Sequence, residues 1–203
     1  MSEEKFRQRW NEAAGTFDKM IAPMERRWLA AGRDWVCSRV QGEVLELAVG
    51  TGLNFPHYPR GTRLTGIEWA PEMLRKARTR AEETGLEVRL QVADATELPF
   101  EDDSFDTVVC TLSLCCISDH DRALAEAARV LRPGGRLLLL DHVASTVPPL
   151  RWLQRLVERF TIPREGEHFT RRPAERLAAH GFDVVDSERQ LFGILERVHA
   201  TAA

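Results

Sequence analysis

The sequence contains neither a block of like charge nor a long hydrophobic run. Its 28 basic and 31 acidic residues are interspersed and leave a formal net charge of -3, so the basic footprint of a nucleic-acid-binding protein is missing. No run reaches the roughly 18 apolar residues that a membrane span needs. Residues 1–10 are charged and carry no apolar segment of signal-peptide length. We therefore expect a soluble, cytoplasmic protein with no nucleic-acid partner.

Cysteine is scarce, and its spacing carries no known signature. The four cysteines are Cys37, Cys110, Cys115 and Cys116. They show neither the C-x-x-C spacing of zinc and redox sites nor the framework of a secreted scaffold, so we predict reduced thiols and no metal site. Internal repeats and Gly/Ser linkers are also absent, and 203 residues are too few for two ordinary enzyme domains. A single domain over 1–203 is expected.

Apolar runs of strand length alternate with helical segments from Gly42 onward, a pattern that predicts a mostly parallel sheet. The turn residues between these segments set their bounds. We expect strands at 43–49, 63–69, 87–93, 105–112 and 136–143, and helices at 71–84 and 119–131, the second followed by a turn at 132–135.

The two ends of the chain differ from this alternation. Residues 3–40 have helical character, and 1–40 is predicted to form a cap over the sheet. After the fifth strand, helices at 150–160 and 172–180 lie in a segment, 144–181, that we expect to cover the substrate. Strands at 182–189 and 194–199 then form a hairpin. The fold class is α/β: a doubly wound, Rossmann-like, mostly parallel seven-stranded sheet with a C-terminal antiparallel hairpin and an N-terminal helical cap.

In such a sheet, ligands bind at the carboxyl ends of the strands, so residues just after each strand are the candidates. Gly50 and Gly52 allow a tight turn and close approach of a ligand to the backbone. Glu68, 18 residues beyond Gly50, is placed to accept hydrogen bonds from ribose hydroxyls. Asp94 is either an acceptor for an adenine amine or an ordinary turn residue. Phe55 stands where a dinucleotide site has its third glycine, which argues against NAD.

These positions belong to five ordered motifs: E-L-A-V-G-T-G, G-I-E-W-A-P-E-M-L, A-D-A-x-x-L-P-F, S-F-D-T-V-V and V-L-R-P-G-G-R-L. Together they resemble the class I S-adenosylmethionine-dependent methyltransferases, in the branch of the ubiquinone/menaquinone C-methyltransferases. The resemblance covers about 43–143. Within the branch, G-T-G-L-N-F-P-H-Y-P and C-T-L-S-L-C-C followed by D-H-V-A are similar to bacterial phospholipid N-methyltransferases and to methyltransferase-like thiol S-methyltransferases.

The resemblance implies S-adenosylmethionine as the cofactor and assigns a role to each matching position. The methionine part would contact Glu46, Ala48, Gly50 and Gly52. Glu68 would hold the ribose, Trp69 and Met73 would flank the adenine ring, and Asp94 and Ala95 would meet the adenine amine. Backbone groups of Cys110, Thr111 and Leu112 would lie under the methionine part. One position departs from the family, which has glycine where this chain has Ala48. A methyl group is tolerated there if the backbone is extended, but it leaves less room for the cofactor.

Methyl transfer from a sulfonium mainly requires alignment of the acceptor and exclusion of water, so a base is optional. Acceptors that are protonated at neutral pH still gain from a group of suitable pKa. His142, at the carboxyl end of the fifth strand, is the candidate base; a hydrogen-bonded structural histidine is the alternative.

The acceptor is predicted only by class: a small apolar or amphipathic molecule such as a thiol, the amine of phosphatidylethanolamine or a quinol, held among Trp10, Phe17, Trp28, Trp152 and Phe160. The helix at 150–160 is apolar on one face and basic on another. It either lies on an anionic membrane surface or packs its apolar face over the substrate pocket. An NAD-dependent oxidoreductase and a non-catalytic cofactor-binding regulatory module are the competing functions.

Overall fold

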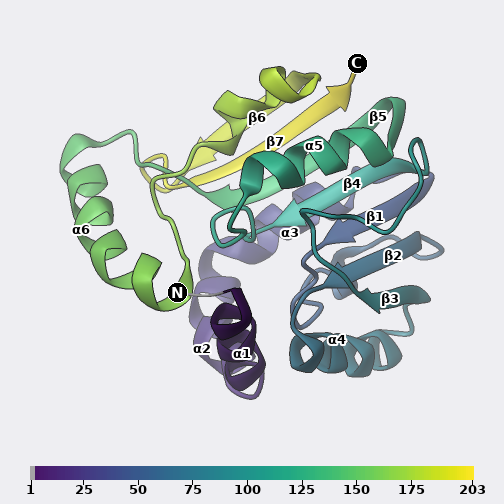
Figure 1. Cartoon of the computed structure of the whole chain (residues 1–203), viewed down its shortest axis with the longest axis horizontal. Helices are drawn as coiled ribbons and strands as arrows, with labels where there is room; N and C mark the ends of the chain where they lie inside the picture. The colour runs from purple at the N-terminus through teal and green to yellow at the C-terminus, as the bar shows by residue number, and fades with distance from the viewer. Residues whose placement is uncertain (1–2) are drawn as a thin grey trace.

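A seven-stranded sheet forms the centre of the computed structural model, which describes residues 3–203 (Figure 1). The strands are β1 (Glu43–Leu47), β2 (Arg63–Glu68), β3 (Val88–Val92), β4 (Phe105–Thr111), β5 (Leu131–His142), β6 (Phe182–Gln190) and β7 (Leu195–Ala202). Their order is β3-β2-β1-β4-β5-β7-β6. β1 to β5 are parallel, whereas β7 runs antiparallel between β5 and β6. The predicted mixed sheet with a C-terminal hairpin is confirmed.

Helices cover both faces of this sheet (Figure 1). They are α1 (Glu3–Ala13), α2 (Phe17–Met24), the π-helix η1 (Glu25–Leu29), α3 (Ala30–Cys37), the 3-10 helix η2 (Phe55–His57), α4 (Pro71–Thr84), α5 (His120–Val130), α6 (Pro148–Glu165) and the 3-10 helix η3 (Pro173–His180). One core cluster joins Leu45 and Val108 to Leu124 of α5, and a second joins Val44 to Leu74 of α4. Because successive strand residues face opposite sides, one strand supplies both cores.

The chain reverses its direction of winding between β1 and β4. From β1 it adds β2 and β3 on one side, and then returns to add β4 and β5 on the other. In a doubly wound sheet this reversal opens a crevice outside the carboxyl ends of the two strands. The candidate site is therefore expected beside Leu47 and Thr111, the last residues of β1 and β4.

The N-terminal helices lie against the loop that follows β1. Asp18 of α2 accepts a hydrogen bond from the Thr51 hydroxyl at 2.6 Å and forms an ion pair with Arg80 of α4 at 2.7 Å. The Asn11 side chain of α1 accepts a hydrogen bond from the Glu72 backbone N–H at 2.9 Å, at the first turn of α4. These bonds join the helical cap to the edge of the sheet where the candidate site lies.

Three elements differ from the sequence prediction. β5 begins at Leu131, which pairs with Phe105, so the residues 132–135 predicted as a turn form an irregularity inside the strand. The predicted helix at 172–180 is a 3-10 helix, Pro173–His180. α6 extends beyond the predicted 150–160, because Pro148 suits a first helical turn and Gly166, with φ of +67°, ends the helix. Within residues 3–203, no helix combines the length and apolar content required to span a membrane.

Candidate active site

The loop after β1 has a backbone that bends sharply at three positions. Ala48, Gly50 and Gly52 have φ of +51°, +57° and +81°. A Cβ added at Gly50 would have no atom within 4 Å, so the backbone here borders open space. A Cβ at Gly52 would lie 2.6 Å from the ring of Phe55. Gly52 is therefore required by the packing of Phe55, and Gly50 is the position that leaves room for a ligand.

Ala48 does not have the extended backbone on which its tolerance was predicted to depend. Its φ of +51° lies in the left-handed region, which costs an L-residue with a side chain roughly 1–2 kcal/mol. Leu112, which follows the neighbouring strand β4, has φ of +53° and donates its N–H to the carbonyl of Leu140 at 2.6 Å. Two residues with side chains thus hold strained turns at adjacent strand ends, as functional sites often do.

Glu68 closes the same edge from β2. Its carboxylate accepts hydrogen bonds from the backbone N–H groups of Gly50, at 2.9 Å, and Ala70, at 2.8 Å. Burial raises the pKa of Glu68, although these backbone bonds act in the opposite direction. A carboxylate offers about four lone-pair sites, so further acceptor capacity remains for hydroxyl groups. The Glu68 side chain therefore fixes the β1 loop and can still bind a ligand.

Asp94, after β3, is a turn residue in this structure. Its Oδ1 accepts hydrogen bonds from the backbone N–H and the hydroxyl of Thr96, both at 2.8 Å. Its Oδ2 has no hydrogen-bond partner among residues 3–203, so one acceptor oxygen is available at this strand end. Ala95 beside it is buried. The turn interpretation is correct, and the predicted contact with an adenine amine stays a prediction.

The two residues predicted to flank the adenine are placed differently. Met73 is buried in a small cluster with Ala14 and Ala70 beneath the cap, whereas Trp69 is half-buried. The half-buried indole of Trp69 is therefore accessible to a ligand at the strand ends, whereas Met73 packs beneath this region.

A buried polar network, only part of which was predicted from the sequence, lies beneath the β1 loop. Glu46 accepts hydrogen bonds from Asn54 at 2.9 Å and from the Tyr58 hydroxyl at 2.8 Å. Arg33 of α3 donates to Asn54 at 2.8 Å and to the Thr111 hydroxyl at 3.3 Å. Burial raises the pKa of Glu46 to about 7, against the lowering by its two donors. Glu46 and Thr111 thus position the loop through this network, and their predicted contact with the cofactor stays a prediction.

Asn54 and Tyr58 had one signal in the sequence, the segment G-T-G-L-N-F-P-H-Y-P that carried the finer resemblance. Arg33 had none, because it lies in a helix before the sheet begins. Cys110 is fully buried under the same strand end, where burial raises its thiol pKa well above the ordinary value.

His142 ends β5 within a second group of ionisable residues. Its Nε2 lies 3.2 Å from Glu167, and its ring stacks on Phe169 with centroids 4.7 Å apart. Burial lowers the pKa of His142, but the bond to Glu167 and the charges of Asp141, Glu167 and Glu158 outweigh burial and raise the pKa overall. The Nδ1 atom is buried without a hydrogen-bond partner among residues 3–203.

Cys115 joins this group. Possible ligand atoms of Cys115 (Sγ), His142 and Glu167 lie within 4.8 Å of one another. Thiolate, imidazole and carboxylate groups are the ligand types that Zn²⁺ prefers. Burial raises the pKa of Cys115 well above its usual value, and a metal ligand must be the thiolate. All four cysteines are free, and Cys115 and Cys116 have sulfurs 3.4 Å apart. The arrangement is that of a protonated thiol beside a histidine–glutamate pair.

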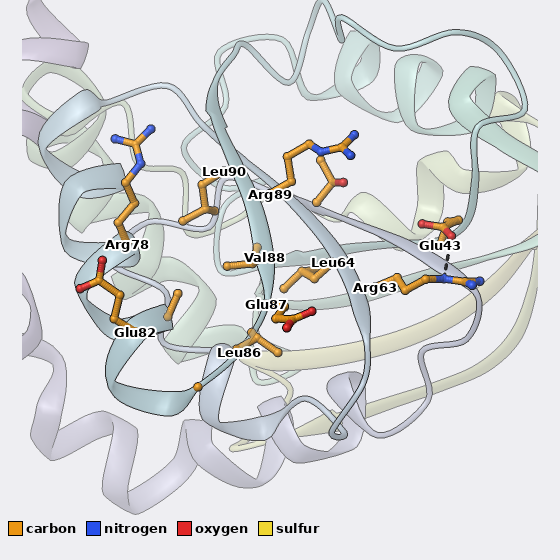
Figure 2. A pocket seen from close by; sticks show the side chains of 13 residues that line it. Glu43, Arg63, Leu64, Arg78, Glu82, Leu86, Glu87, Val88, Arg89 and Leu90 are labelled. Carbon is orange, nitrogen blue, oxygen red and sulfur yellow. Dashed lines mark ion pairs between the residues drawn. The ribbon is translucent and has the colours of Figure 1, made fainter.

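A hollow of about 980 Å³ lies elsewhere, between α4 and the amino ends of β2 and β3 (Figure 2). Side chains of both charges line it, including the ion pair of Arg63 and Glu43 at 2.6 Å. The candidate site lies at the carboxyl ends of the parallel strands, whereas this hollow lies at their amino ends. The hollow is therefore not part of the candidate site.

Comparison with known proteins finds similarity to methyltransferases. The methyltransferase domain family matches residues 45–139. A phosphatidylethanolamine N-methyltransferase of Cereibacter sphaeroides is 41% identical over 59% of this chain. A ubiquinone/menaquinone biosynthesis C-methyltransferase of Paracoccus denitrificans is 37% identical over 74% of this chain. Over the matched part, the chain is similar to class I S-adenosylmethionine-dependent methyltransferases.

The match to these relatives is partial. This chain spans 60% and 62% of their own lengths, which is less than two thirds. Among solved structures, a [4+2]-cyclase, SpnF, has a TM-score of 0.68 at 23% identity, over 84% of this chain and 79% of that one. This likeness supports the fold alone, since one fold hosts many reactions.

S-adenosylmethionine is the cofactor of this family, and the residues at the strand ends fit it. Gly50 leaves open space beside the backbone, Glu68 has lone pairs left for ribose hydroxyls, and Asp94 has a free oxygen for an amine. These groups lie at the ends of the adjacent strands β1, β2 and β3. Phe55 stands where a dinucleotide site would need a third glycine, and its ring packs against Gly52, which argues against NAD.

Proposed function

We propose that this protein transfers a methyl group from S-adenosylmethionine to a small acceptor that binds beside the carboxyl ends of β4 and β5. The observation that carries the proposal is the open backbone at Gly50 after β1, next to acceptor oxygens of Glu68 and Asp94 after β2 and β3. The ionisable pair of His142 and Glu167 lies on the other side of β1, at the end of β5. When bound, the cofactor supplies an activated methyl group on a sulfonium. The chain has to bind the acceptor, orient it, exclude water and manage its proton.

His142 is proposed as the base that takes this proton. The carboxylate of Glu167 accepts the Nε2–H of the imidazole, which fixes the tautomer and leaves a lone pair on Nδ1. Nδ1 has no other partner among residues 3–203. Because this atom is buried, it is shielded from bulk water. Glu167 acts through His142 and is a positioning residue.

The proposed acceptor carries an ionisable X–H group. The two relatives act, by name, on the amine of phosphatidylethanolamine and on a carbon in quinone biosynthesis. A protonated amine, a quinol and a thiol all lose a proton on methylation, so each gains from a base whose pKa lies near neutrality. The predicted aromatic pocket stays a prediction; two of its members, Trp152 and Phe160, are 66% and 58% exposed to solvent.

The test is calorimetric titration with S-adenosylmethionine and its demethylated product, with NAD as the control ligand. We expect binding of both sulfur compounds, a loss of at least about tenfold in affinity for Glu68→Gln, and no heat with NAD. Methyl transfer to thiols, quinols and phosphatidylethanolamine is then measured with labelled cofactor. A folded protein that binds neither sulfur compound refutes the proposal. Binding without transfer to any acceptor class favours the regulatory-module alternative.

A further inference from the structure

Helix α6 is attached to the protein by its polar side. Gln154 and Glu158 are each 9% exposed. Gln154 accepts a hydrogen bond from the Ser145 N–H and donates to the carbonyls of Val143 and Phe169, at 2.8 to 3.1 Å. Glu158 accepts hydrogen bonds from the backbone and side chain of Thr170 at 2.7 to 2.9 Å. Buried polar side chains with satisfied bonds fix the orientation of this helix.

The opposite side of α6 is apolar and faces solvent. We call it the apolar face of α6; it consists of Trp152, Leu153, Leu156, Val157 and Phe160, which are 37% to 66% exposed. Their spacing places them on one side of the helix, away from Gln154 and Glu158. The packing of this face over a substrate pocket stays a prediction. A soluble helix normally buries its apolar stripe, so a contiguous exposed one indicates an interaction surface.

A row of arginines borders the apolar face. Arg151, Arg155 and Arg159 recur every fourth residue and form a line along one flank of the helix. None of the three has a hydrogen-bond or ion-pair partner in the part of the chain that the structure describes. Glu158, the acidic residue nearest to them in the helix, points inward to Thr170. The border of the apolar face therefore carries uncompensated positive charge.

α6 stands at the edge of the sheet that carries the candidate site. β5 ends at His142, and α6 begins at Pro148 after a short loop. Figure 1 shows α6 set apart from the sheet at the side toward which β4 and β5 point. A surface that contacted the apolar face would therefore lie near the carboxyl ends of the strands.

We propose that the apolar face of α6 docks this protein on an anionic lipid bilayer. Tryptophan and phenylalanine favour the membrane interface, and a helix with an apolar side bordered by arginines lies in the plane of that interface. Anionic headgroups neutralise the arginine row, whereas a second copy would bring another row of arginines against it. This inference goes beyond methyl transfer and does not depend on it.

Sedimentation of the full chain with vesicles tests the proposal. The vesicles are phosphatidylcholine alone or phosphatidylcholine mixed with phosphatidylglycerol. We expect binding to the mixed vesicles only, weakened roughly thirtyfold in Arg155→Gln/Arg159→Gln, since each arginine near an anionic surface contributes about fivefold. Arg60→Gln/Arg89→Gln is the matched control, because both arginines are exposed at the opposite edge of the sheet, and it should bind as the wild type does.

A second measurement locates the contact. Bromine-labelled phospholipid in the mixed vesicles should quench tryptophan fluorescence of the wild type, and Trp152→Phe should lose most of this quenching while it still sediments. Trp152→Ser/Phe160→Ser should abolish sedimentation, with Val185→Ser on β6 as the control for an exposed apolar residue; thermal melts establish that each variant is folded. No vesicle binding by the folded wild type overturns the proposal. So does a dimer in sedimentation velocity that only the α6 variants dissociate, because the face would then contact a second copy.

Discussion

Replacing Ala48 by glycine should stabilise this protein, which is the reverse of the usual effect of glycine. The left-handed backbone at Ala48 costs roughly 1–2 kcal/mol for a residue with a Cβ. Glycine removes that strain but adds about 0.5–1 kcal/mol of unfolded-state entropy. The net gain in the free energy of unfolding is about 0.5–1 kcal/mol, which corresponds to a rise in Tm of roughly 1–4 °C for a domain of this size.

The assay is thermal unfolding followed by circular dichroism, with Ala70→Gly as the matched control. Ala70 also follows a strand of the same edge, but its φ is -91° and it is fully buried. Glycine there relieves no strain and removes a packed methyl group, so Ala70→Gly should lower Tm. The reasoning is refuted if Ala48→Gly lowers Tm as the control does, because the left-handed turn would then carry no strain that glycine can relieve.

Three further predictions concern the site. The rate of methyl transfer should rise with pH through the raised pKa of His142, because the neutral imidazole is the base. In Glu167→Gln the pKa of His142 falls and the rise in kcat moves to lower pH, while His142→Asn loses about 10²–10⁴ in kcat. A pH profile that Glu167→Gln does not move excludes the histidine–glutamate pair as the base. The pKa of Glu46 is raised from 4.5 to about 7 in the folded protein, so the unfolded state binds fewer protons in that window and the free energy of unfolding should fall as pH rises from 4.5 to about 7. Urea titrations of Glu46→Gln should show a free energy of unfolding that changes less with pH. An equal change with pH in the wild type and the variant contradicts the raised pKa. Asp94→Asn retains an acceptor oxygen for the turn with Thr96 and places an amide NH₂ where a ligand amine would bind. The affinity for S-adenosylmethionine should therefore fall about tenfold, with Tm unchanged. An unchanged affinity would mean that Asp94 is a turn residue only.

The local elements of the sheet could be read from the sequence. Helix Pro71–Thr84 has the bounds that its leading proline and following glycine predict, and each predicted strand is present within a few residues. These features depend on neighbours in the chain, through propensity and hydrophobic period, which is why a single sequence contains them. The positions of Gly50, Glu68 and Asp94 at strand ends followed from the same local pattern, because parallel strands bring their carboxyl ends to one edge.

Contacts between distant segments were decided by the tertiary structure. Arg33 of α3 reaches Thr111 at the end of β4, and Glu167 reaches His142 from beyond α6; no local pattern specifies such pairs. The φ of Ala48 follows from the turn that the neighbouring strands impose, since alanine alone would not choose it. The sequence of α6 determined that the helix has an apolar side and a polar side. Only the packing decided that Gln154 faces the protein and Trp152 faces solvent, because amphipathic periodicity defines two faces but does not say which of them finds a partner within the fold.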